Sequence, residues 1–266
     1  MKDYDHVHFF GWNHIDSVAR GMQDHGLIDV STTIASSENE LQLDKCRECI
    51  RNVSIVAVSP YLTKRSLELF KKHSKVFPCF NGVETNIFIP RSVEPKRKGP
   101  IRVLLCNKPP AKAYDCHGLE IAQKIQKLCD NDYLKVTLHI SKYNTSNKLD
   151  RESMIKLYQD HDVFVHTGRH HLGTPNMAFE AASCGLAIVS TANGCLPLLF
   201  EGTKDKMGTL VEIPQYFPKP GAHHTVIAKE HKKDDDTAQA IATILTKMTR
   251  KQADVMGAAA RRAVVE

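Results

Sequence analysis

The stretch from Asp162 to Gly194, DVFVHTGRHHLGTPNMAFEAASCGLAIVSTANG, decides the fold of this chain. It begins with a short apolar and β-branched run, Asp162–Val165, which is typical of a buried strand in a parallel sheet. Gly173-Thr174-Pro175-Asn176 then predicts a helix start, because proline is favoured in the first turn, where its missing N–H costs nothing. We expect the helix to cover Met177–Ser183, with Gly185 as a left-handed cap, and a second strand to follow at Leu186–Ser190.

A strand–helix–strand unit of this kind is a candidate anion site. In a parallel sheet the helix N-terminus faces the carboxyl ends of the strands, and its N–H groups and dipole favour phosphate. The sequence therefore points to a phosphate-bearing ligand near Gly173–Asn176.

The alternation of strand and helix patterns extends over the whole chain and predicts an α/β protein with parallel sheets. Residues 91–100 are polar, contain two prolines and a basic cluster, and are expected to link a first domain at 1–90 to a second at 101–266. The other expected strands are 5–10, 29–34, 55–59, 75–79, 101–106, 134–140 and 208–211. The other expected helices are 16–22, 41–50, 62–73, 118–129, 152–160 and 234–266.

The composition is that of a globular protein, with 42% hydrophobic and 25% charged residues among 266. No apolar run reaches the ~18 residues that span a bilayer, and the N-terminus lacks the apolar segment of a signal peptide. We therefore expect a cytoplasmic protein without a transmembrane segment. The net charge of +6 permits an acidic partner such as a nucleotide, a nucleic acid or an anionic lipid, but does not require one.

The eight cysteines do not form a disulfide framework in a chain of this length. Cys46 and Cys49 are spaced like one half of a zinc site, but no second pair follows at the required distance. We interpret them as two thiols on a helix.

The stretch quoted above resembles the donor-binding signature of retaining glycosyltransferases with two Rossmann-like domains, most closely glycosyltransferase family 4. Residues 80–90, FNGVETNIFIP, are similar to the interdomain segment of that family, and Tyr4–His8 is similar to a family strand that ends in a histidine. The resemblance covers nearly the whole chain. The residues of the signature that fall in register are Gly173, Pro175, Asn176, Glu180, Ala181, Cys184 and Gly185.

The resemblance implies a fold and an activity. The fold would be GT-B, an α/β architecture of two Rossmann-like domains, here with a shortened N-terminal domain. The activity would be transfer of a sugar from a nucleotide sugar, UDP- or GDP-linked, to an acceptor hydroxyl with retention of anomeric configuration. Such enzymes are metal-independent and need no cofactor besides the donor. The acceptor stays open between a glycan, a lipid, a small molecule and a modified nucleic acid.

The resemblance also implies which residues bind the donor. Glu180 would hydrogen-bond the ribose hydroxyls. The backbone N–H groups near Gly173, Thr174, Pro175 and Asn176 would face the diphosphate or the sugar, and Gly194 would lie in the second donor-side turn.

Three further residues are the candidates for catalysis. Lys108 and Lys112 follow the first strand of the second domain and would stabilise the growing charge of the diphosphate leaving group. His117-Gly118 is an alternative counterpart of the family's Lys-Gly pair. His8 would contact the sugar or align the acceptor.

The chain also departs from the family pattern. Leu172 and Leu198 occupy positions where the family has acidic residues that touch the donor, and the chain looks short at both ends. These departures motivate an alternative function, a degenerate and non-catalytic protein that binds a nucleotide sugar or a partner chain. A second alternative is a glycosyltransferase that acts on modified nucleic-acid bases.

A basic cluster precedes the expected donor turn and could substitute electrostatically for the missing partners. A metal site is disfavoured there, because no carboxylate pairs with the histidines. The cluster consists of His166, Arg169, His170 and His171.

Overall fold

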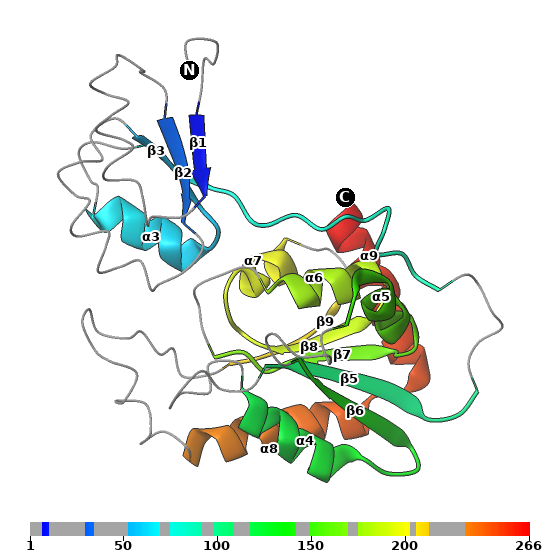
Figure 1. The fold of residues 1–266 in the computed structure, drawn as a ribbon. Helices are drawn as coiled ribbons and strands as arrows, with labels where there is room; N and C mark the ends of the chain where they lie inside the picture. The colour runs from blue at the N-terminus through cyan, green and yellow to red at the C-terminus, as the bar shows by residue number, and fades with distance from the viewer. Residues whose placement is uncertain are drawn as a thin grey trace. The chain divides into compact units, whose positions relative to one another are not determined.

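The computed structural model describes residues 7–10, 30–34, 53–69, 75–91, 98–108, 118–141, 149–169, 175–202, 206–212 and 232–266. The chain divides into two compact units, and among the described residues the boundary falls between Asn81 and Gly82. Figure 1 labels most of the helices and strands of both units. The expected linker at 91–100 lies further along the chain, so residues 82–90, assigned to the first domain from the sequence, pack with the second unit.

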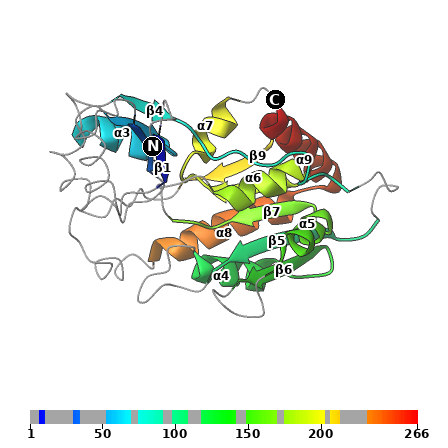
Figure 2. The same ribbon diagram turned by 45° about the horizontal axis from the view of Figure 1, so that its top comes forward.

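The first unit contains a parallel sheet with the strand order β1-β2-β3-β4. Its core includes Ile55, Ala57 and Leu62. Helix α3 covers Pro60–Leu69, so it begins two residues before the expected helix at 62–73, at the proline itself. The Ser59 side chain accepts a hydrogen bond from the N–H of Leu62 at 3.2 Å, which satisfies one N–H of the first helical turn. The elements are β1 (Val7–Phe10), β2 (Val30–Ile34), β3 (Val53–Ala57), α3 (Pro60–Leu69) and β4 (Val76–Pro78). Figure 1 labels the first four, and Figure 2 labels β4.

The second unit contains a parallel sheet with the strand order β6-β5-β7-β8-β9. The strands are β5 (Ile101–Asn107), β6 (Leu134–Ile140), β7 (Val163–His166), β8 (Ala187–Thr191) and β9 (Gly208–Val211). The helices are α4 (Leu119–Cys129), α5 (Arg151–Gln159), α6 (Asn176–Ser183), α7 (Leu196–Glu201), α8 (Lys232–Lys247) and α9 (Arg250–Val265).

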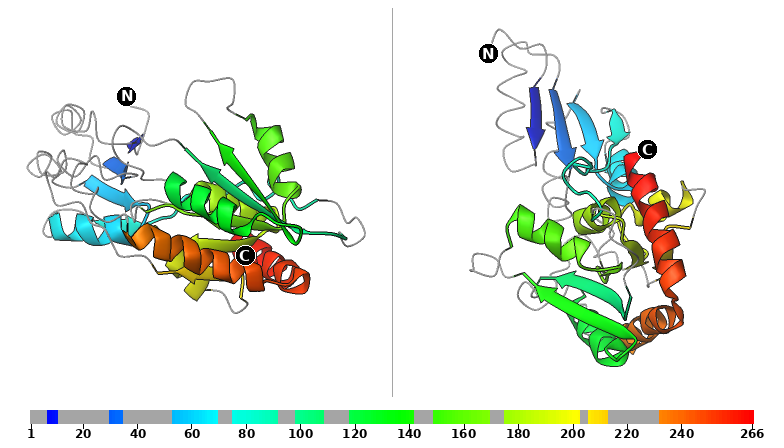
Figure 3. Two further views of the ribbon diagram at one scale, coloured as in Figure 1. Left: turned by 90° about the horizontal axis from the view of Figure 1, so that it is seen from below. Right: turned by 90° about the vertical axis from the view of Figure 1, so that its right-hand side faces the viewer.

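Successive side chains of a strand point to opposite faces of its sheet, and both faces of this sheet are buried. Val103 and Leu105 of β5 pack in one core with α4 and α8, whereas Leu104 and Cys106 pack in a second core with α5, α6 and α7. α9 contributes to both cores. It is the red helix that leads to the C-terminus in Figure 3. The near-continuous apolar sequence of β5 is thus explained by helices on both faces.

The C-terminal region differs from the prediction. The single helix expected at 234–266 is wrong, because α8 ends at Lys247 and a separate α9 begins at Arg250. Thr249 and Gln252 form a capping box, in which the Thr249 side chain accepts from the N–H of Gln252 and the Gln252 side chain accepts from the N–H of Thr249. The short helix α7 was not predicted. The helices expected at 16–22 and 41–50, like Cys46 and Cys49, lie outside the described residues.

Candidate functional site

The central strands β5 and β7 lie side by side, but the helices that follow them pack on opposite faces of the sheet. Ligands of open α/β sheets bind in the crevice that such a reversal leaves at the carboxyl ends of the strands. Here the side chain of Asn107 donates to the Thr167 hydroxyl at 3.0 Å, and that hydroxyl donates to the Gly118 carbonyl at 2.9 Å. These bonds join the ends of β5 and β7 to the start of α4.

Gly118 is required at this junction. Its φ is +68°, in the left-handed region, and a Cβ there would lie 2.0 Å from the Thr167 carbonyl oxygen. Only glycine therefore allows α4 to begin this close to the end of β7.

Helix α6 starts directly at this edge. The helix begins at Asn176, one position before the expected Met177, which is within the usual variation of helix ends. Pro175, with a φ of −75°, is the residue that precedes the helix. The predicted left-handed cap is confirmed, since Gly185 has a φ of +84°. Gly185 donates to the Ala182 carbonyl at 2.9 Å and Leu186 donates to the Ala181 carbonyl at 3.1 Å, which together form a Schellman motif.

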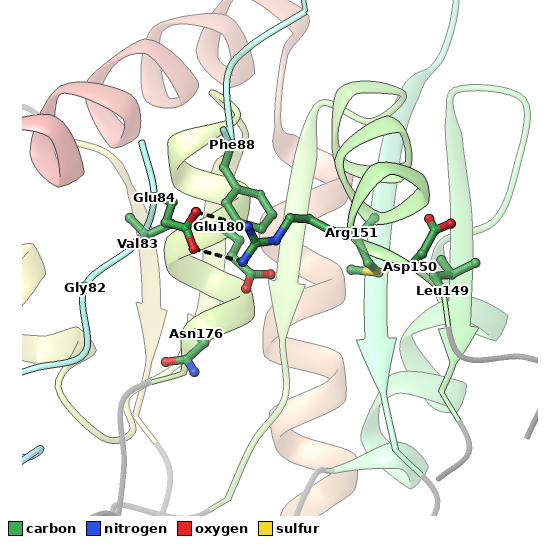
Figure 4. Close-up of a pocket in the computed structure, with 10 residues that line it drawn as sticks. Gly82, Val83, Glu84, Phe88, Leu149, Asp150, Arg151, Asn176 and Glu180 are labelled. Atoms are coloured by element: carbon green, nitrogen blue, oxygen red, sulfur yellow. Dashed lines mark hydrogen bonds and ion pairs between the residues drawn. The ribbon is translucent and has the colours of Figure 1, made fainter. Parts of the chain in front are cut away.

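A cavity of about 250 Å³ lies between α5, α6 and the segment that follows Asn81. Asn176 and Glu180 line it from α6; because they are four residues apart, they share one face of the helix. Figure 4 shows the residues around it. The complete lining is Gly82, Val83, Glu84, Phe88, Leu149, Asp150, Arg151, Met154, Asn176 and Glu180.

The carboxylate of Glu180 is half-buried in this cavity. The hydroxyl of Tyr158, a fully buried residue of α5, donates to Glu180 Oε2 at 2.8 Å. Burial raises the pKa of Glu180, while the Tyr158 hydrogen bond and the positive charge of Arg151 oppose that rise. A partly buried carboxylate with one engaged oxygen is well suited to accept hydrogen bonds from a ligand.

Arg151 and Glu84, which both line the cavity, are paired with each other (Figure 4). The guanidinium donates to both carboxylate oxygens of Glu84, at 2.8 and 3.0 Å, in a bidentate pair. Both side chains are about half exposed, so the pair contributes only about 0.2–1 kcal/mol to stability. The lining of this cavity thus contains one cation, Arg151, and the carboxylates of Glu84, Asp150 and Glu180.

The cavity wall formed by residues 82–90 is held by Arg261 of α9. Its guanidinium donates to the carbonyls of Thr85, Phe88 and Ser183 at 2.7–2.8 Å. The Ser183 hydroxyl in turn donates to the Phe88 carbonyl at 2.6 Å. The C-terminal helix therefore fixes the connecting segment against α6.

The predicted site residues are only partly described. Lys108 is half-buried and directly follows β5, at the carboxyl edge where the prediction put it. Gly194 lies in the turn after β8 with a φ of +55°. His8 lies in β1 of the first unit, paired with Ser31, and only its backbone is described. Outside the described residues lie Lys112, His117, His170, His171, Leu172, Gly173 and Thr174.

The two described residues of the basic cluster both contact neighbouring polar side chains. Arg169 forms a largely buried ion pair with Asp234 in the first turn of α8. His166 Nε2 lies 3.2 Å from the side-chain nitrogen of Asn193. The described residues contain no group of three or more His, Cys, Asp or Glu side chains placed to hold a metal ion.

The sequence named Glu180 and Asn176 as candidates, and both line the cavity, but it assigned no role to Tyr158, Arg151 or Glu84. Tyr158 and Glu84 both occur in the segments that resemble the family, so a signal was present, but no pattern linked them to Glu180. Their partners lie 22 and 67 positions away along the chain. Only the packing of α5 on α6 and of residues 82–90 beside them brings these groups together.

Comparison with known proteins gives a fold but no sequence family. No protein-family model matches the chain, and no curated protein matches its sequence. Solved structures of glycosyltransferases do match over almost its full length. They include a glycosyltransferase from Rickettsia africae, with a TM-score of 0.60 and 15% identity over 96% of this chain and 76% of that one.

Two further solved structures also match, one of them a complex with UDP and glucose. Sucrose-phosphate synthase from Thermosynechococcus elongatus matches with a TM-score of 0.62 and 17% identity, over 98% of this chain and 69% of that one. HepE from Anabaena, in complex with UDP and glucose, matches with a TM-score of 0.66 and 12% identity, over 98% and 73%. At these identities the likeness defines the fold, which is that of the GT-B glycosyltransferases, as the sequence predicted.

None of the helices in the described ranges is both long enough and apolar enough to cross a bilayer.

Proposed function

We propose that the chain is a glycosyltransferase that takes a sugar from a nucleotide sugar and transfers it to an acceptor hydroxyl. The observation that carries the proposal is the Glu180 carboxylate, which lines a cavity beside the carboxyl edge of the second sheet, next to the N-terminus of α6. The fold shared with glycosyltransferases, one of them in complex with UDP and glucose, supports the same assignment.

The cavity fits part of such a donor. Sites that enclose a whole drug-sized ligand measure roughly 300–1,000 Å³, so about 250 Å³ accommodates a nucleoside rather than a complete nucleotide sugar. Glu180 would accept hydrogen bonds from the ribose hydroxyls. The diphosphate and the sugar would extend along the sheet edge toward Lys108, Gly194 and the first turn of α6, where a helix N-terminus favours negative charge.

We further propose that transfer proceeds with retention and without a metal or an additional cofactor. The bond from the anomeric carbon to the diphosphate oxygen breaks, and a bond to the acceptor oxygen forms on the same face of the sugar. The acceptor proton passes to the leaving diphosphate. Lys108 and Lys112 would stabilise the leaving group electrostatically, and His8 would align the sugar or the acceptor.

A second candidate function is binding of a nucleotide sugar without transfer. Leu198, which stands where the family has a glutamate, lies in α7 with 44% of its surface exposed and supplies no carboxylate to the donor. In this second function the cavity would still bind the nucleoside, but no sugar would be transferred.

Turnover distinguishes the two candidates. The purified chain is incubated with UDP- and GDP-hexoses, with and without glycan, lipid and small-molecule acceptors, and release of nucleoside diphosphate is measured. Transfer predicts release that is lost in Glu180→Ala and kept in Glu201→Ala, which changes an exposed residue of α7. Saturable donor binding with no release under any condition would favour the non-catalytic function, and an α-linked product from an α-linked donor would support retention.

A further inference from the structure

Tyr158 carries a polar group where a core side chain needs none. The residue is completely buried on α5, packed in the core that α5, α6 and α7 share. A phenylalanine would fill the same space, so the packing of the ring does not account for the hydroxyl. A buried tyrosine hydroxyl needs a hydrogen-bond partner, and here that partner is Glu180 Oε2 at 2.8 Å.

The direction of this hydrogen bond is fixed. Burial, and next the negative charge of Glu180, raise the pKa of Tyr158 far above its ordinary value, so the phenol keeps its proton. The hydroxyl is therefore the donor and the carboxylate is the acceptor. Among the described residues, no hydrogen-bond partner engages the second carboxylate oxygen, Oε1, and Glu180 lines the cavity.

The tyrosine ring itself has little freedom. It meets Phe164 of β7 edge-on at a centroid distance of 6.0 Å and Phe88 at 6.3 Å, with interplanar angles of 77° and 62°. Phe164 is buried in the central strand, and Phe88 belongs to the segment that Arg261 holds. A rigid series of contacts thus runs from the sheet through Tyr158 to the carboxylate.

We propose that Tyr158 is a positioning residue for nucleoside recognition, which fixes the Glu180 carboxylate so that Oε1 faces the ribose hydroxyls of the ligand. The inference rests on the proposed function and deepens it, because it adds the residue that sets the orientation of the ribose-binding carboxylate. A carboxylate held before the ligand arrives loses less rotational freedom on binding than one that must first be ordered.

Other groups around Glu180 do not supply this orientation. Arg151 is engaged in its bidentate pair with Glu84 and acts on Glu180 through its charge. Cys106 of β5 and Cys184 at the end of α6 lie in the adjoining core, and burial raises the pKa of each thiol to about 12, so both stay neutral. The Tyr158 hydroxyl is the hydrogen-bond donor to this carboxylate within the described part of the chain.

The first experiment compares ribonucleotides with deoxyribonucleotides. UDP, GDP and ADP, and their 2′-deoxy counterparts, are titrated calorimetrically into the wild type and into Tyr158→Phe. We expect the wild type to prefer the ribonucleotide, and Tyr158→Phe to lose about ten-fold in ribonucleotide affinity. The loss should be clearly smaller for the 2′-deoxyribonucleotide, which keeps only the 3′-hydroxyl. Tyr133→Phe is the matched control. Tyr133 directly precedes β6 in the same unit, and its hydroxyl donates a hydrogen bond to the Met248 carbonyl that the substitution also removes.

A second pair of variants tests the orientation even if Tyr158→Phe alone is poorly folded. Glutamine offers only one acceptor oxygen, and in Glu180→Gln the Tyr158 hydroxyl takes it, which turns the amide NH₂ toward the cavity. We expect Glu180→Gln to bind ribo- and deoxyribonucleotides alike. In the double variant Tyr158→Phe/Glu180→Gln the oxygen is released and can turn to the ligand, so part of the ribose preference should return.

The possible results separate this inference from the proposed function. An unchanged ribose preference in Tyr158→Phe, or an equal loss for both nucleotide types, overturns the positioning role while leaving nucleotide binding in place. A ribose preference that survives in Glu180→Gln also overturns it. A folded wild type that binds none of the six nucleotides overturns the proposed function, and the inference with it.

Discussion

Replacing Arg261 by methionine tests whether the C-terminal helix holds the wall of the nucleoside cavity. The guanidinium of Arg261 donates to three backbone carbonyls, those of Thr85, Phe88 and Ser183, at 2.7–2.8 Å. Methionine keeps most of the apolar stem and removes every donor. The carbonyls of residues 82–90 then lose the charged group that ties them to α6 and α9.

The size of the effect follows from these contacts. A hydrogen bond to a charged group contributes about 1.5–3 kcal/mol when it is buried. Arg261 is only half-buried, so water replaces part of what is lost, and we expect the second unit to lose about 2–4 kcal/mol in all. For a domain of this size that lowers Tm by roughly 10 °C. Arg261→Lys should recover only part of the loss, because a single ammonium does not reproduce the planar fork.

Thermal unfolding, followed by circular dichroism, measures the loss, and calorimetric titration of nucleotides measures its effect on the cavity. Arg262→Met is the control, since the next residue of α9 is exposed and its replacement should change stability by no more than about 0.5 kcal/mol. Equal melting temperatures for Arg261→Met and Arg262→Met would refute the role of this contact. A destabilised Arg261→Met that bound nucleotide with undiminished affinity would show that residues 82–90 are not part of the site.

Three further predictions concern Glu180, Thr249 and Gly257. Because burial raises the pKa of Glu180 above its ordinary 4.5, the folded state binds its proton more tightly, and wild-type stability falls as pH rises from that value to the raised one. Denaturant titrations should therefore show Glu180→Gln gaining stability relative to the wild type over that interval and keeping the gain at neutral pH; a constant difference at all pH values would contradict this. Thr249→Ala removes the capping box of α9 and should cost about 0.5–2 kcal/mol in the same assay, whereas Thr243→Ala on the exposed face of α8 should cost much less. Gly257→Ala gains up to about 1 kcal/mol of helix propensity, but its Cβ would lie 2.1 Å from the Gly185 carbonyl oxygen, so the clash should dominate and lower Tm; a raised Tm would mean that α9 can move away from β8.

Much of the fold could be predicted, because the signals that define it are local. The strand at Leu134–Ile140 and the strand at Gly208–Val211 were placed with the correct ends, and Gly185 marked the end of α6 through its left-handed backbone. The break between α8 and α9 was missed even though Thr249 and Gln252 carry a capping-box signature. The helical pattern continues on both sides of Thr249, so residues 234–266 were predicted as one helix despite this capping signature.

The site could be predicted only in part, because most of its contacts join distant parts of the sequence. Glu180 was recognised from its place in a resembling motif, and that motif also contains Asn176. The hydrogen bond from Tyr158 and the ion pair of Arg151 with Glu84 depend on how α5, α6 and residues 82–90 pack. No periodicity or spacing encodes such a juxtaposition. The roles of Lys112, Gly173 and Thr174 stay predictions, since these residues lie outside the described part of the chain.

The most direct test of the central claim is a calorimetric titration of UDP, GDP and ADP into the wild-type chain and into Glu180→Ala. The account predicts saturable binding of at least one of these nucleotides by the wild type. It also predicts that the affinity falls by about ten-fold or more in Glu180→Ala and is unchanged in Glu201→Ala. Equal affinity in wild type and Glu180→Ala, or no binding by the folded wild type, would contradict the claim that this cavity is a nucleotide site.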